Sequence, residues 1–201
     1  MTTISSGKPS DIASEIARAV EEYRRDDNLG VLLDRLRELA QSASPEALAD
    51  AAGPYQDFPE VVIPLYEQVV AARPHDARAM VVLANAYWLS GRGPDTVGQL
   101  ASRAISVDST NRGAWHLWAL AESSVRERME RWRQVAARFP HDQLARAALA
   151  DNAASLAGAE HDPLALDLAI ATYRGLLAEA RAPAQRMALE HAIETLSGWR
   201  L

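Results

Sequence analysis

Apolar side chains recur every three or four residues along most of this chain, with polar side chains between them. Ile12, Ile16 and Val20 follow this spacing, and so do the leucines between residues 29 and 39. Such a repeat places side chains on one face of an α-helix, whereas a half-buried β-strand would alternate apolar and polar positions. The pattern therefore predicts an all-α protein.

Helix-start and helix-stop signals divide this pattern into helices joined by short connections. Ser44, followed by a proline, predicts an N-cap, and Asp57 with Glu60 has the spacing of a capping box. Beyond residue 75 the expected helices are 76–90, 94–107, 111–124, 125–138, 141–157, 163–180 and 184–199. Because the connections are short, neighbouring helices should pack antiparallel as hairpins.

The hairpins show signs of repetition. Residues 72–76 and 137–142 share an Ala-Arg start and a Pro-His-Asp end, and residues 107–111 stand midway between them. The spacing of the two prolines is about twice the period of a repeat built from two helices. We therefore expect a stack of similar hairpins.

Within these units, Leu83 and Ala84 form a large-then-small pair and Trp115 opens a helix. Trp132 lies in the helix that follows, and Pro140 closes that unit. In these features residues 58–200 resemble the tetratricopeptide repeat (TPR) family. The resemblance implies antiparallel helical hairpins stacked as a short solenoid, with a divergent N-terminal helical pair and a C-terminal capping helix. The expected organisation is a disordered leader at 1–9, N-terminal helices at 10–57 and the repeat array at 58–200.

Glu122 departs from the family pattern, because an aromatic side chain is usual at that position. The unit that begins at Arg112 is also about three residues shorter than the family period.

In such an array the first helix of each hairpin lines a concave groove, which is the expected binding surface. Helix periodicity and the resemblance together select five candidate groove contacts: Arg78, Asn85, Trp88, His116 and Asp151. They combine an aromatic anchor with side chains that can bond a peptide backbone, so a peptide or protein segment is the expected ligand. Some TPR proteins hold the terminal carboxylate of chaperone tails with lysines. Val81 occupies the position where such a lysine would be needed, so we do not expect a receptor for chaperone tails.

The composition excludes several kinds of chemistry. The chain has no cysteine, which excludes disulfides and thiolate sites. Its only lysine is Lys8, in the expected leader, which argues against a Schiff-base lysine or the lysine of a phosphate-binding loop. No histidine pair brackets a glutamate, no Gly-x-Ser-x-Gly motif is present, and Gly91 and Gly93 fit a turn between helices better than a dinucleotide loop. We therefore expect a protein that is not an enzyme and holds no cofactor.

Histidine precedes aspartate at His75, His141 and His161. Such pairs can ligate a divalent metal in a hydrolase, which is one alternative function. The favoured interpretation is that each aspartate caps the helix that follows it.

The densest positive patch lies on one expected helix and comprises Arg126, Arg128, Arg131, Arg133 and Arg138. Interleaved glutamates favour a solvated face with ordinary ion pairs, including one between Glu127 and Arg131. Trp115 and Trp118 are expected to pack in the core, whereas Trp88 should be exposed because Tyr87 takes the neighbouring core position.

A formal charge of −6 argues against binding to nucleic acid or to an anionic membrane. The start of the chain lacks a secretory signal, so a cytoplasmic location is expected, and the arginine and alanine content points to a bacterium. The sequence thus favours a cytoplasmic adaptor that binds a protein partner of unknown identity. A dedicated immunity or secretion chaperone for one cognate protein, and a homodimer through the terminal helices, are alternatives left open.

Overall fold

A computed structural model describes residues 9–200 of the chain, so the expected leader lies outside the described residues except for Pro9, which begins a helix. The described residues contain α-helices, one short 3-10 helix and no strand. These elements are α1 (Pro9–Asp26), α2 (Leu29–Ser42), α3 (Pro45–Ala52), η1 (Gly53–Tyr55), α4 (Pro59–Ala72), α5 (Ala77–Leu89), α6 (Pro94–Val107), α7 (Arg112–Leu120), α8 (Val125–Arg138), α9 (Gln143–Glu160), α10 (Pro163–Glu179) and α11 (Pro183–Ser197). The prediction of an all-α chain is confirmed.

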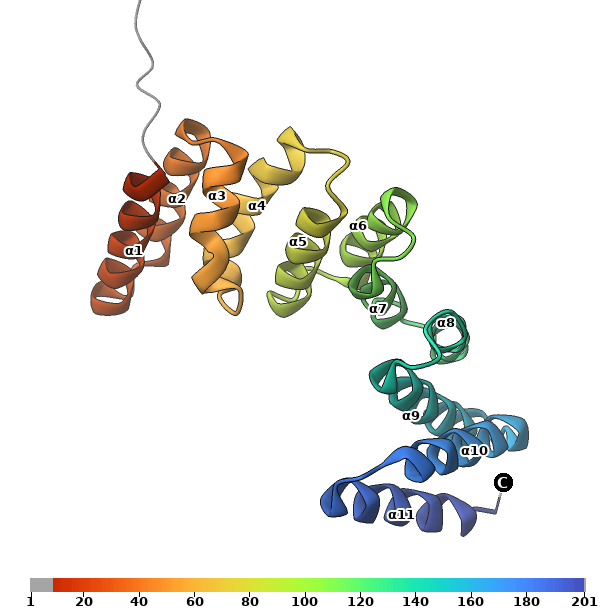
Figure 1. Cartoon of the computed structure of the whole chain (residues 1–201). Helices are drawn as coiled ribbons and strands as arrows, with labels where there is room; N and C mark the ends of the chain where they lie inside the picture. Colours follow the sequence, from red (N-terminus) through yellow and green to blue (C-terminus); the bar gives the residue numbers. More distant parts are fainter. Residues whose placement is uncertain (1–8, 201) are drawn as a thin grey trace, which may run out of the picture. The chain divides into compact units, whose positions relative to one another are not determined.

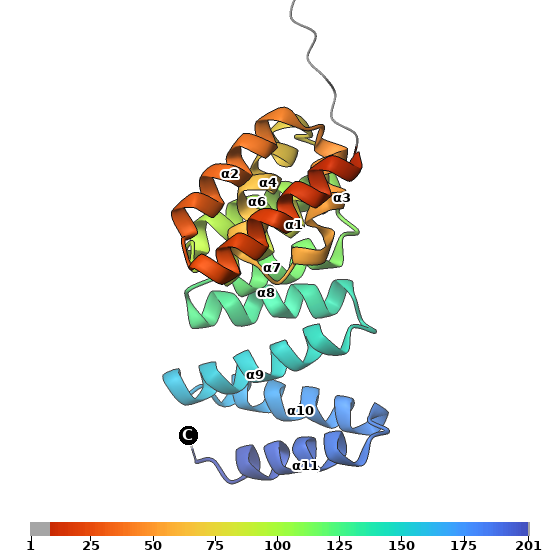
Figure 2. The same ribbon diagram turned by 90° about the vertical axis from the view of Figure 1, so that its left-hand side faces the viewer.

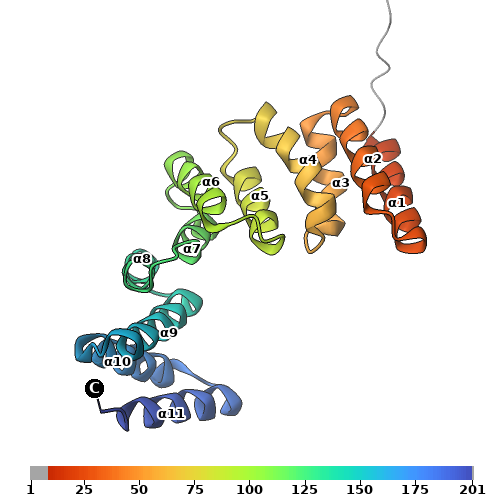
Figure 3. The ribbon, with the colours of Figure 1, turned by 180° about the vertical axis from the view of Figure 1, so that it is seen from behind.

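The helices form two compact units, one that ends at Leu117 and one that begins at Trp118. In the first unit α1 packs on α2, α3 on α4 and α5 on α6, as successive hairpins (Figure 1). The N-terminal pair also packs on the next hairpin, since α1 contacts α3 and α2 contacts α4 (Figure 3). The first two helices of the chain are therefore stacked on the helices that follow them.

In the second unit α8, α9, α10 and α11 pack in chain order (Figure 2). Ala153 and Ala169 form a buried cluster with Leu196 of α11, and Ala157 belongs to a neighbouring cluster. Small side chains let helix backbones approach closely, which explains the alanine-rich composition of these helices.

The predicted aspartate caps are present. Asp76 Oδ1 accepts a hydrogen bond from Ala79 N at 2.9 Å, and Asp142 and Asp162 accept bonds from the first turns of α9 and α10. Ser44 caps α3 in the same way. These side chains satisfy backbone N–H groups that would otherwise lack a partner at a helix start.

The capping box expected at Asp57 is wrong. The residue that precedes α4 is Phe58, which makes no side-chain cap, and the helix begins at Pro59. Proline at the first helical position has a fixed φ and no N–H to satisfy, so this helix starts without an acidic cap. The same helix continues through Pro64 to Ala72.

The helix expected at 111–124 ends earlier, at Leu120. Glu122 accepts a hydrogen bond from Ser124 N at 2.9 Å, and Ser124 then caps α8. This local side-chain bond competes with continuation of the helix and shortens α7.

No helix among residues 9–200 is long and apolar enough to span a membrane.

Candidate protein-binding surface

The exposed face of α5 carries three of the five candidate contacts. Arg78, Asn85 and Trp88 are all exposed, and Trp88 keeps 39% of its surface accessible. Tyr87 is buried beside it, as expected, because the neighbouring position faces the helices that pack against α5. The structure therefore brings these three side chains onto one helix surface.

The phase of the helix adds an apolar position that the sequence analysis missed. Steps of four, seven and eleven residues from Arg78 return to nearly the same side of an α-helix, which places Val82, Asn85 and Leu89 on the centre of the exposed face. Leu89 is 53% exposed, more than Trp88, which lies at the edge of this face. Counting turns from the packed residues selected Arg78, Asn85 and Trp88 but not Leu89, whose exposure depends on how α4 and α6 contact α5.

The polar side chains on this face are not used by the fold. Within residues 9–200, the side chains of Arg78 and Asn85 make neither a hydrogen bond nor an ion pair with another residue. Exposed amide and guanidinium groups without internal partners can form hydrogen bonds with a ligand without breaking a bond in the protein.

Arg78 also lines an open hollow of about 580 Å³ at the turn ends of the first unit. Its other lining residues are Arg73, Pro74, His75, Asp76, Ala77, Val107 and Asp108. The hollow is thus formed by the turn between α4 and α5 together with the end of α6.

His116 lies on α7 and is half-buried. One turn earlier on the same helix, Gly113 approaches α5, where a Cβ added to it would be 3.1 Å from Val81 Cγ1. Val81, which the sequence analysis placed on the groove, is therefore half-buried against α7.

Asp151 belongs to the second unit, on α9. It is exposed, and its carboxylate accepts a hydrogen bond from the hydroxyl of Tyr173 on α10. Burial of the Tyr173 side chain and its bond to Asp151 raise the pKa of that phenol well above its ordinary value. One carboxylate oxygen of Asp151 is therefore already engaged within its own unit.

The two tryptophans expected in the core are only half-buried. Trp115 donates from Nε1 to the carbonyl of Ser109 at 3.0 Å. The ring of Trp118 is covered by the guanidinium of Arg131, which lies 4.6 Å from the ring centroid. Polar partners therefore replace part of the apolar packing that the sequence analysis expected.

The arginine cluster of α8 is engaged in contacts within the second unit. Arg128 donates to Asn152 at 2.8 Å, Arg133 pairs with Glu130, and Arg131 pairs with Glu122 at 2.6 Å rather than with Glu127 as predicted. Arg128 and Arg131 thus bond to another helix and to the turn before α8, and Arg133 pairs within α8, so the cluster is not a free cationic patch.

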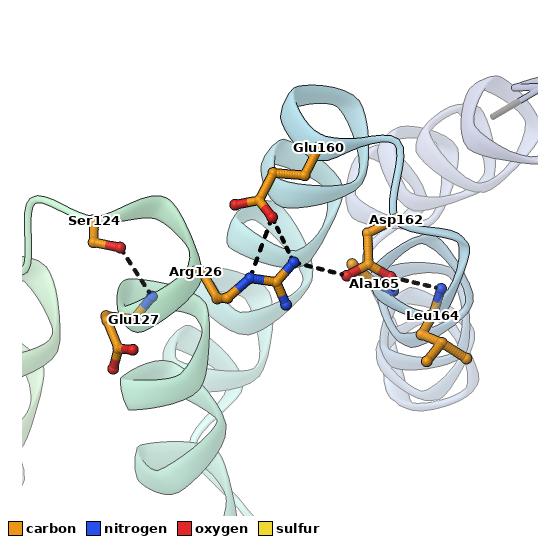
Figure 4. A network of polar contacts seen from close by, with 7 residues as sticks. All are labelled: Ser124, Arg126, Glu127, Glu160, Asp162, Leu164 and Ala165. Atoms are coloured by element: carbon orange, nitrogen blue, oxygen red, sulfur yellow. Dashed lines mark hydrogen bonds and ion pairs between the residues drawn. The ribbon is translucent and has the colours of Figure 1, made fainter.

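Arg126 makes the most extended of these contacts (Figure 4). Its Nη2 pairs with Glu160, the last residue of α9, at 2.5 Å, and with Asp162, the N-cap of α10, at 3.2 Å. The N–H of Ala165 and the guanidinium of Arg126 lower the pKa of Asp162, against an opposing effect of burial. This network ties the start of α8 to the turn between α9 and α10.

A second polar contact that the sequence analysis missed lies in the first unit. Tyr87 donates its hydroxyl to Glu67 of α4 at 2.9 Å, and Arg92 pairs with the same carboxylate at 3.2 Å. Burial and the hydrogen bond to Glu67 raise the pKa of Tyr87 to about 12. Arg92 sits between Gly91 and Gly93, whose positive φ angles make the turn that was expected there.

The His-Asp pairs serve the fold in the described residues. Each of their aspartates caps a helix, and no group of three or more metal-binding side chains is present within residues 9–200. The arrangement gives no support to the metal-dependent hydrolase alternative.

Comparison with solved structures shows what this fold is similar to. A thermophilic TPR protein of Thermus thermophilus matches with a TM-score of 0.55 at 19% identity, over 92% of this chain and 98% of that one. MamA matches with a TM-score of 0.56 at 14% identity, over 87% and 95% of the two chains, and a double mutant of MamA RS-1 matches with 0.54 at 15% identity, over 90% and 96%. No protein-family model matches the chain, and no curated protein matches it. The TPR-like fold is thereby confirmed.

Proposed function

We propose that this chain is a non-enzymatic interaction module that binds a peptide or protein segment on the exposed face of α5. The observation that carries the proposal is that the side chains of Arg78 and Asn85 lie there without a hydrogen bond or ion pair to another of the described residues, beside the exposed side chains of Trp88 and Leu89. A surface that joins unused hydrogen-bonding groups to an aromatic anchor has the composition of a binding site.

Each side chain has a distinct role in this proposal. Trp88 and Leu89 cover an apolar side chain of the client, and the Asn85 amide bonds to its backbone. Arg78 supplies a charged contact. His116 of the first unit and, separately, Asp151 of the second unit are proposed as further contacts, as the sequence analysis predicted. A location of this protein in a bacterial cytoplasm also stays a prediction.

Affinity capture with matched variants tests the proposal. The parent chain, the double variant Asn85→Ala, Trp88→Ala and the control Gln99→Ala would each be immobilised after circular dichroism has shown equal helix content. Gln99 is an exposed residue of α6 in the same unit, which makes it a control for loss of a surface amide. Captured proteins would be identified by mass spectrometry, and the affinity of each partner would be measured by calorimetry.

The expected result is a partner held by the parent and by the Gln99 variant, with binding reduced about tenfold or more by the double variant. Equal binding of that partner by all three proteins would reject the α5 surface. A single stoichiometric partner of high affinity would support the dedicated immunity or secretion chaperone over a general adaptor.

A further inference from the structure

The charged side chains around Arg78 differ in whether they already form hydrogen bonds or ion pairs within the protein. Arg73 is paired with Glu46 and with Asp76, and Asp76 also caps α5. Asp108 accepts two hydrogen bonds from Thr110, from its N–H at 2.9 Å and from its hydroxyl at 2.6 Å. Both carboxylates of the hollow are therefore engaged in local structure.

Of the two arginines among the described residues that line the hollow, Arg73 is paired and Arg78 is not. Its guanidinium forms no ion pair or hydrogen bond within residues 9–200, although it is close enough to Asp108 to attract that carboxylate. Arginine presents a planar fork of N–H donors that matches the two oxygens of a carboxylate. The hollow is open enough to admit a side chain of this kind.

The distance between this cation and the apolar end of the α5 face limits the shape of a ligand. Arg78 and Leu89 lie on the same side of α5, eleven residues apart, which corresponds to about 16 Å at a rise of about 1.5 Å per residue. An extended peptide covers about 3.3 Å per residue, so about five residues span that distance.

We propose that α5 selects an extended segment that carries an acidic side chain about five residues from an apolar one. The acidic side chain pairs with Arg78 in the hollow, and the apolar side chain packs on Leu89 and Trp88. This inference rests on the proposed function, because it assigns the chemistry of the client to the same helix face.

The net charge of −6 does not oppose such a client at short range. Charges separated by more than about 8 Å are largely screened at physiological ionic strength. A carboxylate in contact with Arg78 therefore responds to that guanidinium more strongly than to the acidic groups on distant helices.

Fluorescence anisotropy with synthetic probes tests the spacing. Each probe is a fluorescein-labelled peptide with one Glu and one Leu in a Gly-Ser background, and two to eight residues separate them. The full chain is titrated against every probe, and a matched series carries Gln in place of Glu. The expected result is tightest binding with about four residues between the two side chains, weakened about fivefold when Glu becomes Gln.

Three variants decide the assignment. With Arg78→Gln the Glu and Gln probes should bind equally, while Arg103→Gln, which alters an exposed arginine of α6, should keep the fivefold preference. Trp88→Ala should weaken the binding of every probe, because each probe carries a Leu. Circular dichroism checks that each variant is folded.

The outcomes separate this inference from the proposed function. Probes that need Trp88 but are indifferent to Glu and to Arg78 would overturn the acidic client and leave the α5 surface in place. No binding of any probe would also overturn the inference, and the capture experiment would then judge the surface. Binding unaffected by both Arg78→Gln and Trp88→Ala would refute both proposals.

Discussion

Arg131 and Trp118 are joined twice, because the guanidinium of Arg131 lies over the indole ring at 4.6 Å and its Nη1 donates to the carbonyl oxygen of Trp118 at 2.8 Å. The other end of the guanidinium pairs with Glu122 at 2.6 Å, and both side chains of this ion pair are half-buried. Glu122 occupies the position where a TPR unit usually has an aromatic residue. A polar cluster therefore holds the α7–α8 turn where aromatic packing was expected.

Replacing Arg131 with Ala should destabilise the chain by about 1–3 kcal/mol, because it leaves Glu122 without its cation and uncovers Trp118. Arg131→Lys should recover only part of the loss, since an ammonium group cannot bond to both partners as a planar fork does. Urea unfolding followed by circular dichroism measures both changes. Arg133→Ala is the control, because its pair with Glu130 is exposed and should matter by less than about 0.5 kcal/mol. Equal effects of the two alanine variants would contradict this account.

Gly113→Ala should reveal the close approach of α5 and α7. Alanine favours a helix over glycine by about 1 kcal/mol, but its Cβ would lie 3.1 Å from Val81 Cγ1. We expect little or no gain in the parent and a gain of about 1 kcal/mol in a Val81→Ala background, where the obstructing methyl group is absent. A double-mutant cycle of unfolding free energies tests this, and strictly additive effects would show that the two side chains do not interfere.

His161→Gly should stabilise the chain by about 1 kcal/mol. His161 ends α9 with φ of 52°, a left-handed conformation that costs a residue with a Cβ more than it costs glycine. His75→Gly is the matched control, because His75 also precedes a capping aspartate but has no positive φ. Thermal unfolding should show a higher Tm for the first variant and no increase for the second.

Asp162 should make stability depend on pH. Its pKa is lowered in the folded chain, so the carboxylate contributes stability above its unfolded pKa, and that contribution is lost as the pH falls through the folded value. Asp162→Asn keeps a capping oxygen but removes the charge that faces Arg126. We expect the Tm difference between parent and variant to shrink as the pH falls from 6 to about 3. A Tm difference that does not change with pH would show that the charge of Asp162 does not cause the stabilisation.

Local sequence signals were enough to place most helices. Asp76, Asp142 and Ser44 cap the helices that follow them because a short polar side chain reaches the N–H groups of its own helix start. The error at Asp57 arose from a competing local signal, the proline at residue 59, which starts a helix without a cap.

The surface was harder to predict because it depends on packing between helices. Leu89 was missed since its exposure depends on the direction from which α4 and α6 contact α5. The contacts of Tyr87 with Glu67 and of Arg126 with Glu160 join residues that lie 20 and 34 positions apart. No periodicity within one helix indicates such a pair. The spacing of Glu127 and Arg131 predicted an ion pair between them, but Arg131 pairs with Glu122 instead.

The packing of each hairpin on its neighbour in the chain has a consequence for the speed of folding. In the first unit α1 meets α2 and α3, and α5 meets α4 and α6, so native contacts join segments that are close in sequence. Little chain entropy is lost in closing the short loops between them, and proteins rich in such local contacts fold in microseconds to milliseconds. Nascent hairpins of this chain can therefore form as soon as both of their helices have been synthesised.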